Sequence, residues 1–325
     1  MICVCFFVKF QSGSAQRFFA LEPADSLHKK RFVTASAIGG GTYSAAMIGL
    51  NQAWYADYPR SDFHFFRDGH EWLQMDKLGH TFSAFTEARF AASAFRWTGI
   101  SQKKSAWLGF GTAELFQASF EILDGFSAEY GFSWGDIGCN TLGSALFLGQ
   151  ELAWHEQRIL LKMSALPVNY DRSAIFSTDY KQVTTLKKRA DELYGTGFIN
   201  LFLKNYNTLV IWSSVNLQSF APDREDSKIP AWLNIAVGHG ANNLFRGAPL
   251  YSWTDQKTGA IFQLDPKKYP RERQFFLSLD VDFRRLKVKN RFLRTVLFVL
   301  NGVKFPAPAL ELTSRGQFKF HSIYF

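Results

Sequence analysis

Charged residues and cysteines are scarce in this chain of 325 residues. Only 20% of the residues are Asp, Glu, Lys or Arg, whereas 17% are aromatic and 34 are Phe, a low polarity that is compatible with contact to lipid. Cys3 and Cys5 lie at the start and Cys139 stands alone, so no disulfide framework is expected. The hydrophobic content of 47% is sufficient for a sizeable core, and the length allows two domains.

Familiar nucleic-acid and catalytic motifs are also missing. The sequence has no zinc-finger spacing, no glycine-rich phosphate loop and no aromatic sheet motif beside basic residues, so nucleic acid is not an expected partner. It contains neither an HExxH metal motif nor a GxSxG nucleophile elbow. Ser133 is better explained as a helix cap than as a nucleophile, and Cys139 as an inert thiol in a helix.

The net charge of +9 is unevenly distributed. Counting Lys and Arg against Asp and Glu gives 13 − 15 = −2 for residues 1–160 and 24 − 13 = +11 for residues 161–325. A basic half can face nucleic acid, anionic lipid or an acidic polymer, and charge alone does not separate these partners. Because nucleic-acid motifs are missing, we expect a membrane or anionic lipid as the partner; a protein partner stays unidentified.

Composition divides the chain into four segments. Residues 1–15, "MICVCFFVKFQSGSA", combine a short apolar run with small residues, which predicts a signal segment and export; the alternative is a buried strand. No small residue precedes Cys5, so a lipid anchor there is not expected. We assign 16–165 to a helical bundle, 166–207 to a polar connection and 208–325 to a basic antiparallel β region.

About four helices are expected in the bundle. Residues 32–56 carry no charged side chain, which is long enough to span a bilayer, but their small residues equally fit a buried helix of a soluble bundle. Further helices are predicted at about 74–97, 104–124 and 134–160, the last opened by Ser133 with Asp136 three residues on. The fold class is therefore α+β, with an N-terminal helical bundle, expected to be membrane-associated, before the β region.

Two features of the β region suggest contact with lipid. Alternation in "RQFFLSLDVDFRRL" gives one apolar and one largely polar face, which suits a sheet over a helix layer or strands facing lipid in a barrel. Six basic residues then precede an apolar run, as in elements that lie on an anionic membrane surface: Arg284, Arg285, Lys287, Lys289, Arg291 and Arg294. The alternative is a solvated basic loop before a core helix.

Polar side chains form narrow stripes on three of the predicted helices. At 100° per residue, Asp76, His80, Ser83 and Glu87 share an arc of about 60°. If such stripes face outward they are ordinary polar surfaces; if they face inward, the carboxylates must pair, share protons or hold a cation. The candidate polar centre comprises Asp76, His80, Glu121, Asp124, Asp136 and Asn140. Within it, zinc or manganese could bind His80, Asp76, Glu121 and Asp136.

Two of these stretches carry a family resemblance. "DKLGH" at 76–80 and "EILDGFSAEYGFSWGDIGCNTLG" at 121–143 resemble the YfiM-like family of bacterial envelope proteins of unknown function, described as predicted periplasmic lipoproteins. More distantly, their order is similar to VanZ-like membrane proteins. The matching positions are Asp76, Lys77, His80, Glu121, Asp124, Ser133, Asp136, Asn140 and Gly143. The resemblance implies an envelope location, with the protein exported and facing the periplasm, and a polar centre among helices; it implies no activity.

Three functions are compatible with the sequence. The first is an envelope protein with a structural or binding role, whose basic half faces anionic lipid or a partner. The second is a metal-dependent hydrolase of a phosphate or ester, with a metal-bound water as nucleophile and a carboxylate as base. The third is an outer-membrane barrel-like protein with a helical plug. No cofactor is certain, a divalent metal is the candidate, and the sequence leaves open whether the protein is an enzyme.

Overall fold

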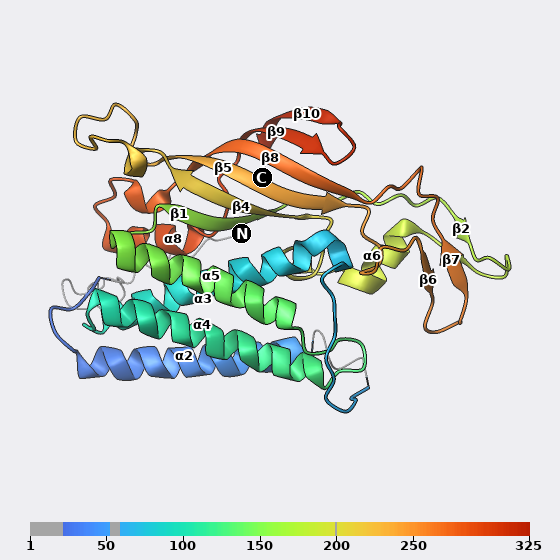
Figure 1. Ribbon diagram of the computed structural model, residues 1–325, viewed down its shortest axis with the longest axis horizontal. Helices are drawn as coiled ribbons and strands as arrows, with labels where there is room; N and C mark the ends of the chain where they lie inside the picture. Colours follow the sequence, from blue (N-terminus) through green and yellow to red (C-terminus); the bar gives the residue numbers. More distant parts are fainter. Residues whose placement is uncertain (1–21, 53–58, 199) are drawn as a thin grey trace, which may run out of the picture.

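The computed structural model describes residues 22–52, 59–198 and 200–325. Its N-terminal part is helical, with the 3-10 turn η2 (Glu71–Gln74) and the helices α2 (Lys29–Leu50), α3 (Met75–Trp97), α4 (Gln102–Gly125) and α5 (Trp134–Trp154). An antiparallel sheet follows, so the predicted α+β fold with about four N-terminal helices is confirmed (Figure 1). The predicted signal segment, residues 1–15, lies outside the described residues.

The main sheet has six strands in the order β1-β4-β5-β8-β9-β10, all antiparallel to their neighbours. They are β1 (Ile159–Ala165), β4 (Leu209–Asn216), β5 (Leu233–Asn242), β8 (Glu272–Val281), β9 (Ala307–Thr313) and β10 (Phe318–Tyr324). The segment leading into β9 runs past the free edge of β1, where Val303 forms a parallel bridge with Met163.

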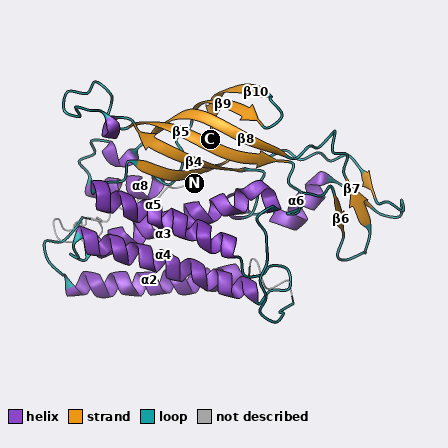
Figure 2. Ribbon diagram, viewed as in Figure 1, coloured by secondary structure: helices purple, strands orange, loops and turns teal. Residues whose placement is uncertain are grey.

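Smaller elements extend one end of this sheet and connect its strands (Figure 2). The hairpin strands are β2 (Ile175–Phe176), β3 (Val183–Thr184), β6 (Ser252–Thr254) and β7 (Ile261–Gln263). The connecting helices are α6 (Leu186–Tyr194), α7 (Asn200–Leu203), η3 (Gln218–Phe220), η4 (Phe283–Arg285) and α8 (Arg291–Leu300). Aromatic and aliphatic side chains from α6, β6 and β7 form a separate small core at this end.

Helix α3 is the centre of the helical layer. Its Phe85, Ala88 and Ala92 are buried against α4 and α5, and Leu160 and Leu161 of β1 join the same core. Two glycines let the helices approach: a Cβ on Gly109 of α4 or Gly143 of α5 would lie within 2.5 Å of an α3 carbonyl oxygen. The helices therefore stack tightly on one side of the sheet, with α2 outermost (Figure 1).

Helix α2 covers most of the uncharged segment 32–56. Within the described part of the chain, no helix combines the length and hydropathy that a membrane crossing requires. The alternative prediction, a buried helix, is wrong, because none of the side chains described in α2 is buried. Its contact with α4 includes the Tyr43 ring, whose centroid lies 5.4 Å from that of Phe116.

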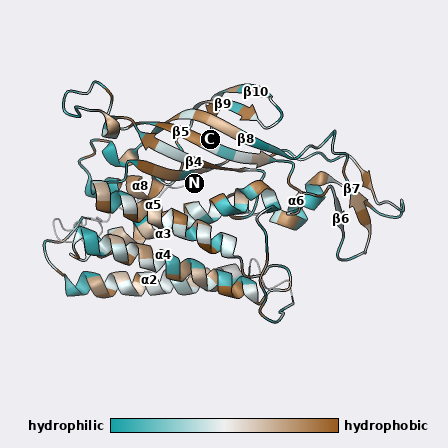
Figure 3. Cartoon of the chain, in the orientation of Figure 1, coloured by the Kyte–Doolittle hydropathy of each residue, from teal (hydrophilic) through white to brown (hydrophobic). Residues whose placement is uncertain are grey.

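The main sheet curls, and its buried face is polar. Tyr324 on β10 contacts Trp212 on β4, with ring centroids 6.1 Å apart, although three strands separate them. The concave side encloses Lys162, which pairs with Asp280 at 2.7 Å while both side chains are 0% exposed. The hydropathy along β8 alternates as predicted (Figure 3). Its apolar side chains Phe275, Leu277 and Leu279 are exposed, whereas Phe276 is buried with the polar side chains of the opposite face.

Candidate functional site

The three predicted stripes meet at the point where α3 crosses α4 and α5. Helix α3 supplies Asp76, Lys77 and His80, α4 supplies Glu121, and α5 supplies Asp136 and Asn140. The closest approach is at Gly143, where a Cβ would lie 2.0 Å from the carbonyl oxygen of Thr81. This contact brings Asn140 Oδ1 to 3.0 Å from His80 Nδ1. The structure therefore brings together five of the six residues of the candidate polar centre in direct contacts.

Lys77 is the principal cation of this centre. Its ammonium group lies 2.5 Å from Asp136 Oδ1, 2.6 Å from Asp68 Oδ2 and 3.3 Å from Asp76 Oδ2. The Ser133 hydroxyl donates to Asp68 Oδ1 at 2.8 Å and accepts from the backbone N–H of Asp136, which confirms its predicted role as the cap of α5. The loop before α3 is thereby tied to the first turn of α5.

His80 lies between acidic groups on both sides of its ring. Its Nε2 is 3.6 Å from Asp136 Oδ1 and 3.8 Å from Asp76 Oδ1, and its Nδ1 is 3.7 Å from Glu121 Oε1. The Tyr206 hydroxyl donates to Asp76 Oδ1 at 2.7 Å. Among the described residues, Asp76, His80 and Asp136 can each offer one ligand atom within 4.8 Å of the others.

Two buried side chains of the centre are incompletely paired. Glu121 is 1% exposed; its Oε2 accepts from the Ser133 backbone, whereas its Oε1 has no hydrogen-bond donor among the described residues. Asn140 is also 1% exposed, and its Nδ2 has no acceptor in the described part of the chain. Buried polar atoms without partners cost about 1–3 kcal/mol each, so they mark a place where the packing serves something besides stability.

The acidic surroundings shift the protonation of the whole centre. Burial alone would lower the pKa of His80, but Asp76, Asp136 and Glu121 together outweigh burial and raise it to about 9. Burial raises the pKa of Glu121 to about 8 and that of Asp136 to about 7, against the opposing charge of His80. At neutral pH the histidine is therefore a cation, while the two carboxyl groups take up protons readily.

An uncommon backbone conformation positions the start of α3. Trp72, Leu73 and Gln74 all have positive φ values, of 47°, 50° and 60°, which costs non-glycine residues roughly 1–2 kcal/mol each. Arg273 of β8 compensates by donating to the Leu73 carbonyl at 2.6 Å and to the Gln74 side chain. This turn sets where Asp76 enters the site, one residue after α3 begins.

The remaining residues of the stripes are paired outside the centre. Glu114 accepts from Thr141 and Ser144 of α5, at 3.0 and 2.6 Å. Gln117 donates to Glu87 at 2.8 Å, and burial raises the pKa of Glu87 to about 8. Asp124 is half-buried near the end of α4, close enough for its charge to raise the pKa of Glu121.

Three further residues, Asp68, Lys77 and Tyr206, belong to the centre, although they are not among the six candidates predicted for it from the sequence. Lys77 follows Asp76 in the "DKLGH" motif, and this position was the signal from which its place in the centre could have been predicted. Asp68 belongs to a loop without periodicity, and Tyr206 comes from a segment 130 residues further along the chain. Neither carries a local pattern that connects it to the helices.

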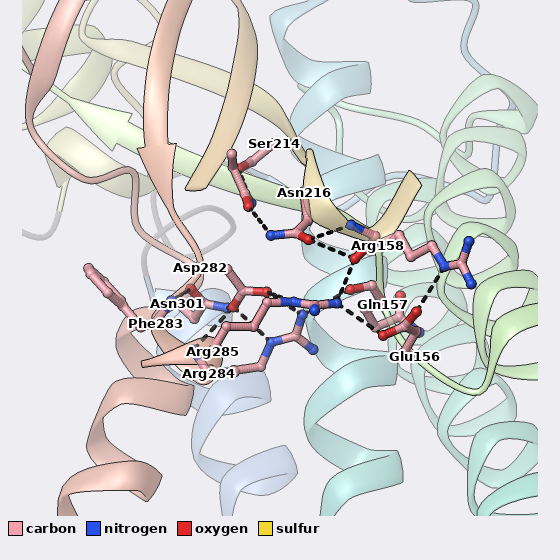
Figure 4. A network of polar contacts seen from close by, with 12 residues as sticks. Glu156, Gln157, Arg158, Ser214, Asn216, Asp282, Phe283, Arg284, Arg285 and Asn301 are labelled. Carbon is pink, nitrogen blue, oxygen red and sulfur yellow. Dashed lines mark hydrogen bonds and ion pairs between the residues drawn. The ribbon is translucent and has the colours of Figure 1, made fainter. Parts of the chain in front are cut away.

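The fold separates the six basic residues predicted for lipid contact into two groups, one that joins elements of the fold and one nearer the surface. Arg284 donates to Asp282 at 2.9 Å and to the Gln157 carbonyl at 3.0 Å, and Arg285 donates to Glu156 at 3.0 Å (Figure 4). These two arginines connect η4 to the loop between α5 and β1, so they help to join the helical layer to the sheet.

The other four basic residues lie nearer the surface. Lys287 and Lys289 are exposed, and Arg294 is 49% exposed. Arg291 and Arg294 both contact the carboxylate of Glu22, Arg291 at 3.2 Å. Helix α8, which also carries Arg291 and Arg294, exposes the apolar side chains Phe292, Leu293 and Val299, of which Phe292 is the most exposed at 64%.

The fold and site define an α+β protein whose helical layer encloses an acid-rich polar centre. Residues 62–148, which contain that centre, match the model of a family described as predicted periplasmic lipoprotein (DUF2279). The match confirms the resemblance to a family of uncharacterised bacterial envelope proteins and the exported, periplasm-facing location. It does not support the more distant VanZ-like resemblance. No curated protein and no solved structure matches the chain.

Proposed function

We propose that this envelope protein binds anionic lipid surfaces through the apolar face of its main sheet. The observation that carries the proposal is the exposure of that face. Exposed apolar side chains on one side of the sheet form a continuous set across four strands: Ile235, Val237, Phe275, Leu277, Leu279, Leu310, Leu312, Phe318 and Phe320.

The strand register places these side chains in rows. Val237 pairs with Leu277, Leu277 with Leu310, and Leu310 with Phe320. Each of these side chains is between 39% and 66% exposed. Because residues opposite one another on one face of a sheet are close neighbours, the row forms one apolar surface instead of scattered contacts.

The same face continues beneath the helices. At β1 and β4 it carries Ala165 and Leu209, which are buried with Met75 of α3. Ala241 of β5 is buried in the same cluster, whereas Ile235, Val237 and the apolar side chains named above on β8, β9 and β10 are exposed. The opposite face holds the buried pair Lys162–Asp280. In an ordinary half-solvated sheet the apolar face is buried and the polar face contacts water. In this sheet the apolar face is exposed and the charged side chains are buried, an arrangement that suits contact with lipid.

Charge complementarity favours an anionic bilayer as the occupant. Lys287 and Lys289 are exposed and follow the end of β8, and Arg315 lies at the turn between β9 and β10, near the opposite end of the same strand. Basic residues near an anionic surface contribute about 1 kcal/mol each. The +11 charge of residues 161–325 is consistent with this attraction.

Vesicle co-sedimentation tests the proposal. The full chain should sediment with phosphatidylglycerol–phosphatidylcholine vesicles more than with phosphatidylcholine alone. Leu277 and Leu310 are each about half-exposed, so replacing both with Ser should remove about 2 kcal/mol and weaken binding roughly 30-fold. Lys287→Ala with Lys289→Ala should weaken binding to the anionic vesicles only.

Leu115→Ser is the matched control, because Leu115 is 70% exposed but lies on α4, away from the sheet. Its variant should bind vesicles as the wild type does. Equal binding by the Leu277/Leu310 variant and the wild type would refute the proposal. Failure to bind either vesicle, together with self-association that depends on Leu277, would instead make the apolar face a contact between copies of the chain.

A further inference from the structure

The polar centre of the helical layer has an excess of negative charge. Its buried or half-buried acids are Asp68, Asp76, Glu121 and Asp136, and its cations are Lys77 and His80. Even with both cations charged, four ionised carboxylates leave a formal charge of −2. Excess buried charge must be neutralised by protons or by another cation, because isolated buried charges cost several kcal/mol.

We propose that Asp76, His80 and Asp136 form a binding site for a divalent transition-metal ion of the zinc type. Two ligands of a tetrahedral ion at about 2.0–2.1 Å lie roughly 3.4 Å apart. His80 Nε2 lies 3.6 Å from Asp136 Oδ1 and 3.8 Å from Asp76 Oδ1, too far for hydrogen bonds and close to ligand spacing. Small movements of side chains would bring all three atoms onto one ion.

The orientation of the imidazole supports a metal-facing Nε2. Nδ1 lies 3.0 Å from Asn140 Oδ1, so a proton on Nδ1 is donated to the amide oxygen, and Nε2 faces the two aspartates. A bound ion would take the place of the proton that the cationic His80 carries on Nε2. Metal-bound histidines commonly donate their other ring N–H to a carbonyl or carboxylate oxygen. Nδ1 also faces Glu121 Oε1, the buried oxygen that has no donor among the described residues.

The other contacts of the ligands are compatible with a bound ion. The two carboxylate oxygens of Asp76 have different partners: Oδ2 faces Lys77, whereas Oδ1 accepts a hydrogen bond from Tyr206 and faces His80. Asp136 Oδ1 is shared with Lys77, which would remain as a donor to the ligating carboxylate. One imidazole nitrogen with carboxylate oxygens is a donor set that zinc accepts. Asp76 is 25% and His80 20% exposed, so an ion can reach the site from solvent.

Isothermal titration of the full chain with zinc chloride, after chelator treatment, tests this proposal. Wild-type protein should bind one zinc ion per chain, and X-ray absorption should show a single imidazole among oxygen ligands. His80→Gln, Asp76→Asn and Asp136→Asn should each weaken binding by on the order of 100-fold, since even outer partners of ligands contribute 10–100-fold.

Two controls separate the site from adventitious binding. Glu87→Gln alters the same stripe of α3 outside the cluster, and His321→Gln removes a histidine that pairs with Glu311 on the sheet at 2.7 Å. Both should bind zinc as the wild type does. No stoichiometric binding, or binding that survives His80→Gln or is lost in His321→Gln, would overturn the assignment. If Asp136→Asn fails to fold, zinc binding by Asp76→Asn decides the question, because Asp76 is the more exposed of the two aspartates. The vesicle assay is independent of this result.

Discussion

A single methyl group at Gly143 should separate α3 from α5. The Cβ of Gly143→Ala would lie 2.0 Å from the Thr81 carbonyl oxygen and 3.1 Å from the Phe85 nitrogen, where ordinary contact begins at 3.4 Å. Both atoms belong to the α3 backbone, so the clash is relieved only if the helices move apart by about 1 Å or more. The His80–Asn140 contact of 3.0 Å should then lengthen beyond hydrogen-bond range.

The energetic cost follows from two opposing terms. Overpacking typically costs about 1–3 kcal/mol, and a backbone clash places this case at the upper end. Replacing Gly by Ala in a helix returns up to about 1 kcal/mol. We therefore expect Gly143→Ala to lower the free energy of unfolding by about 2 kcal/mol, measured from urea denaturation followed by far-UV circular dichroism.

Gly149→Ala is a matched control on the same helix. No atom lies within 4 Å of the position that its Cβ would occupy, so only the gain in helix propensity applies. Its denaturation midpoint should be equal to or above that of the wild type. If Gly143→Ala proved as stable as Gly149→Ala, the close crossing of α3 and α5 would be refuted, and with it the geometry of the polar centre.

Two further predictions concern the ion pairs Asp282–Arg284 and Lys162–Asp280. The interactions of Asp282 with Arg284 outweigh burial and lower its pKa to about 2, so about 2 kcal/mol of stability should be present above pH 4 and lost as the pH falls toward 2. Asp282→Asn should flatten this part of an acid-denaturation curve, and an unchanged curve would contradict the assignment. Lys162→Met should destabilise by about 3–5 kcal/mol because it leaves the buried Asp280 without its ion-pair partner, whereas Lys162→Met with Asp280→Leu should recover most of that loss in thermal unfolding. Equal losses in the single and double variants would exclude coupling between the two groups.

The helical site was largely predictable because it depends on local periodicity. Residues four apart share a helix face, so Asp76 with His80 and Asp136 with Asn140 were identifiable before their helices were placed. Loops have no helical periodicity, so this pattern could not identify Asp68, which lies in a loop. The last predicted helix, 134–160, ends early at Trp154 because His155 adopts a left-handed conformation with φ of 57°.

The sheet was less predictable, because alternation defines two faces without saying which one is buried. The faces of β8 were assigned correctly, but which face is covered depends on the curl that brings Tyr324 over Trp212. The basic segment shows the same limit. In the sequence, Arg284 and Arg285 look like the other basic residues of the segment. In the fold they form ion pairs with Asp282 and Glu156, whereas Lys287 is exposed, and this difference follows only from the three-dimensional arrangement.

The molecule contains two polar interiors, and their charge balance distinguishes them. On the concave side of the sheet, Lys162 matches Asp280, and Lys304 adds hydrogen bonds from its ammonium group to two backbone carbonyls at 2.7 Å. Those contacts account for the charges within the fold. Around His80 the acids outnumber the cations, and Glu121 keeps one oxygen without a donor among the described residues. The centre around His80 is also less deeply buried, with Asp76 25% exposed against 0% for Lys162 and Asp280, so a cation that neutralises its unmatched negative charge can enter from solvent.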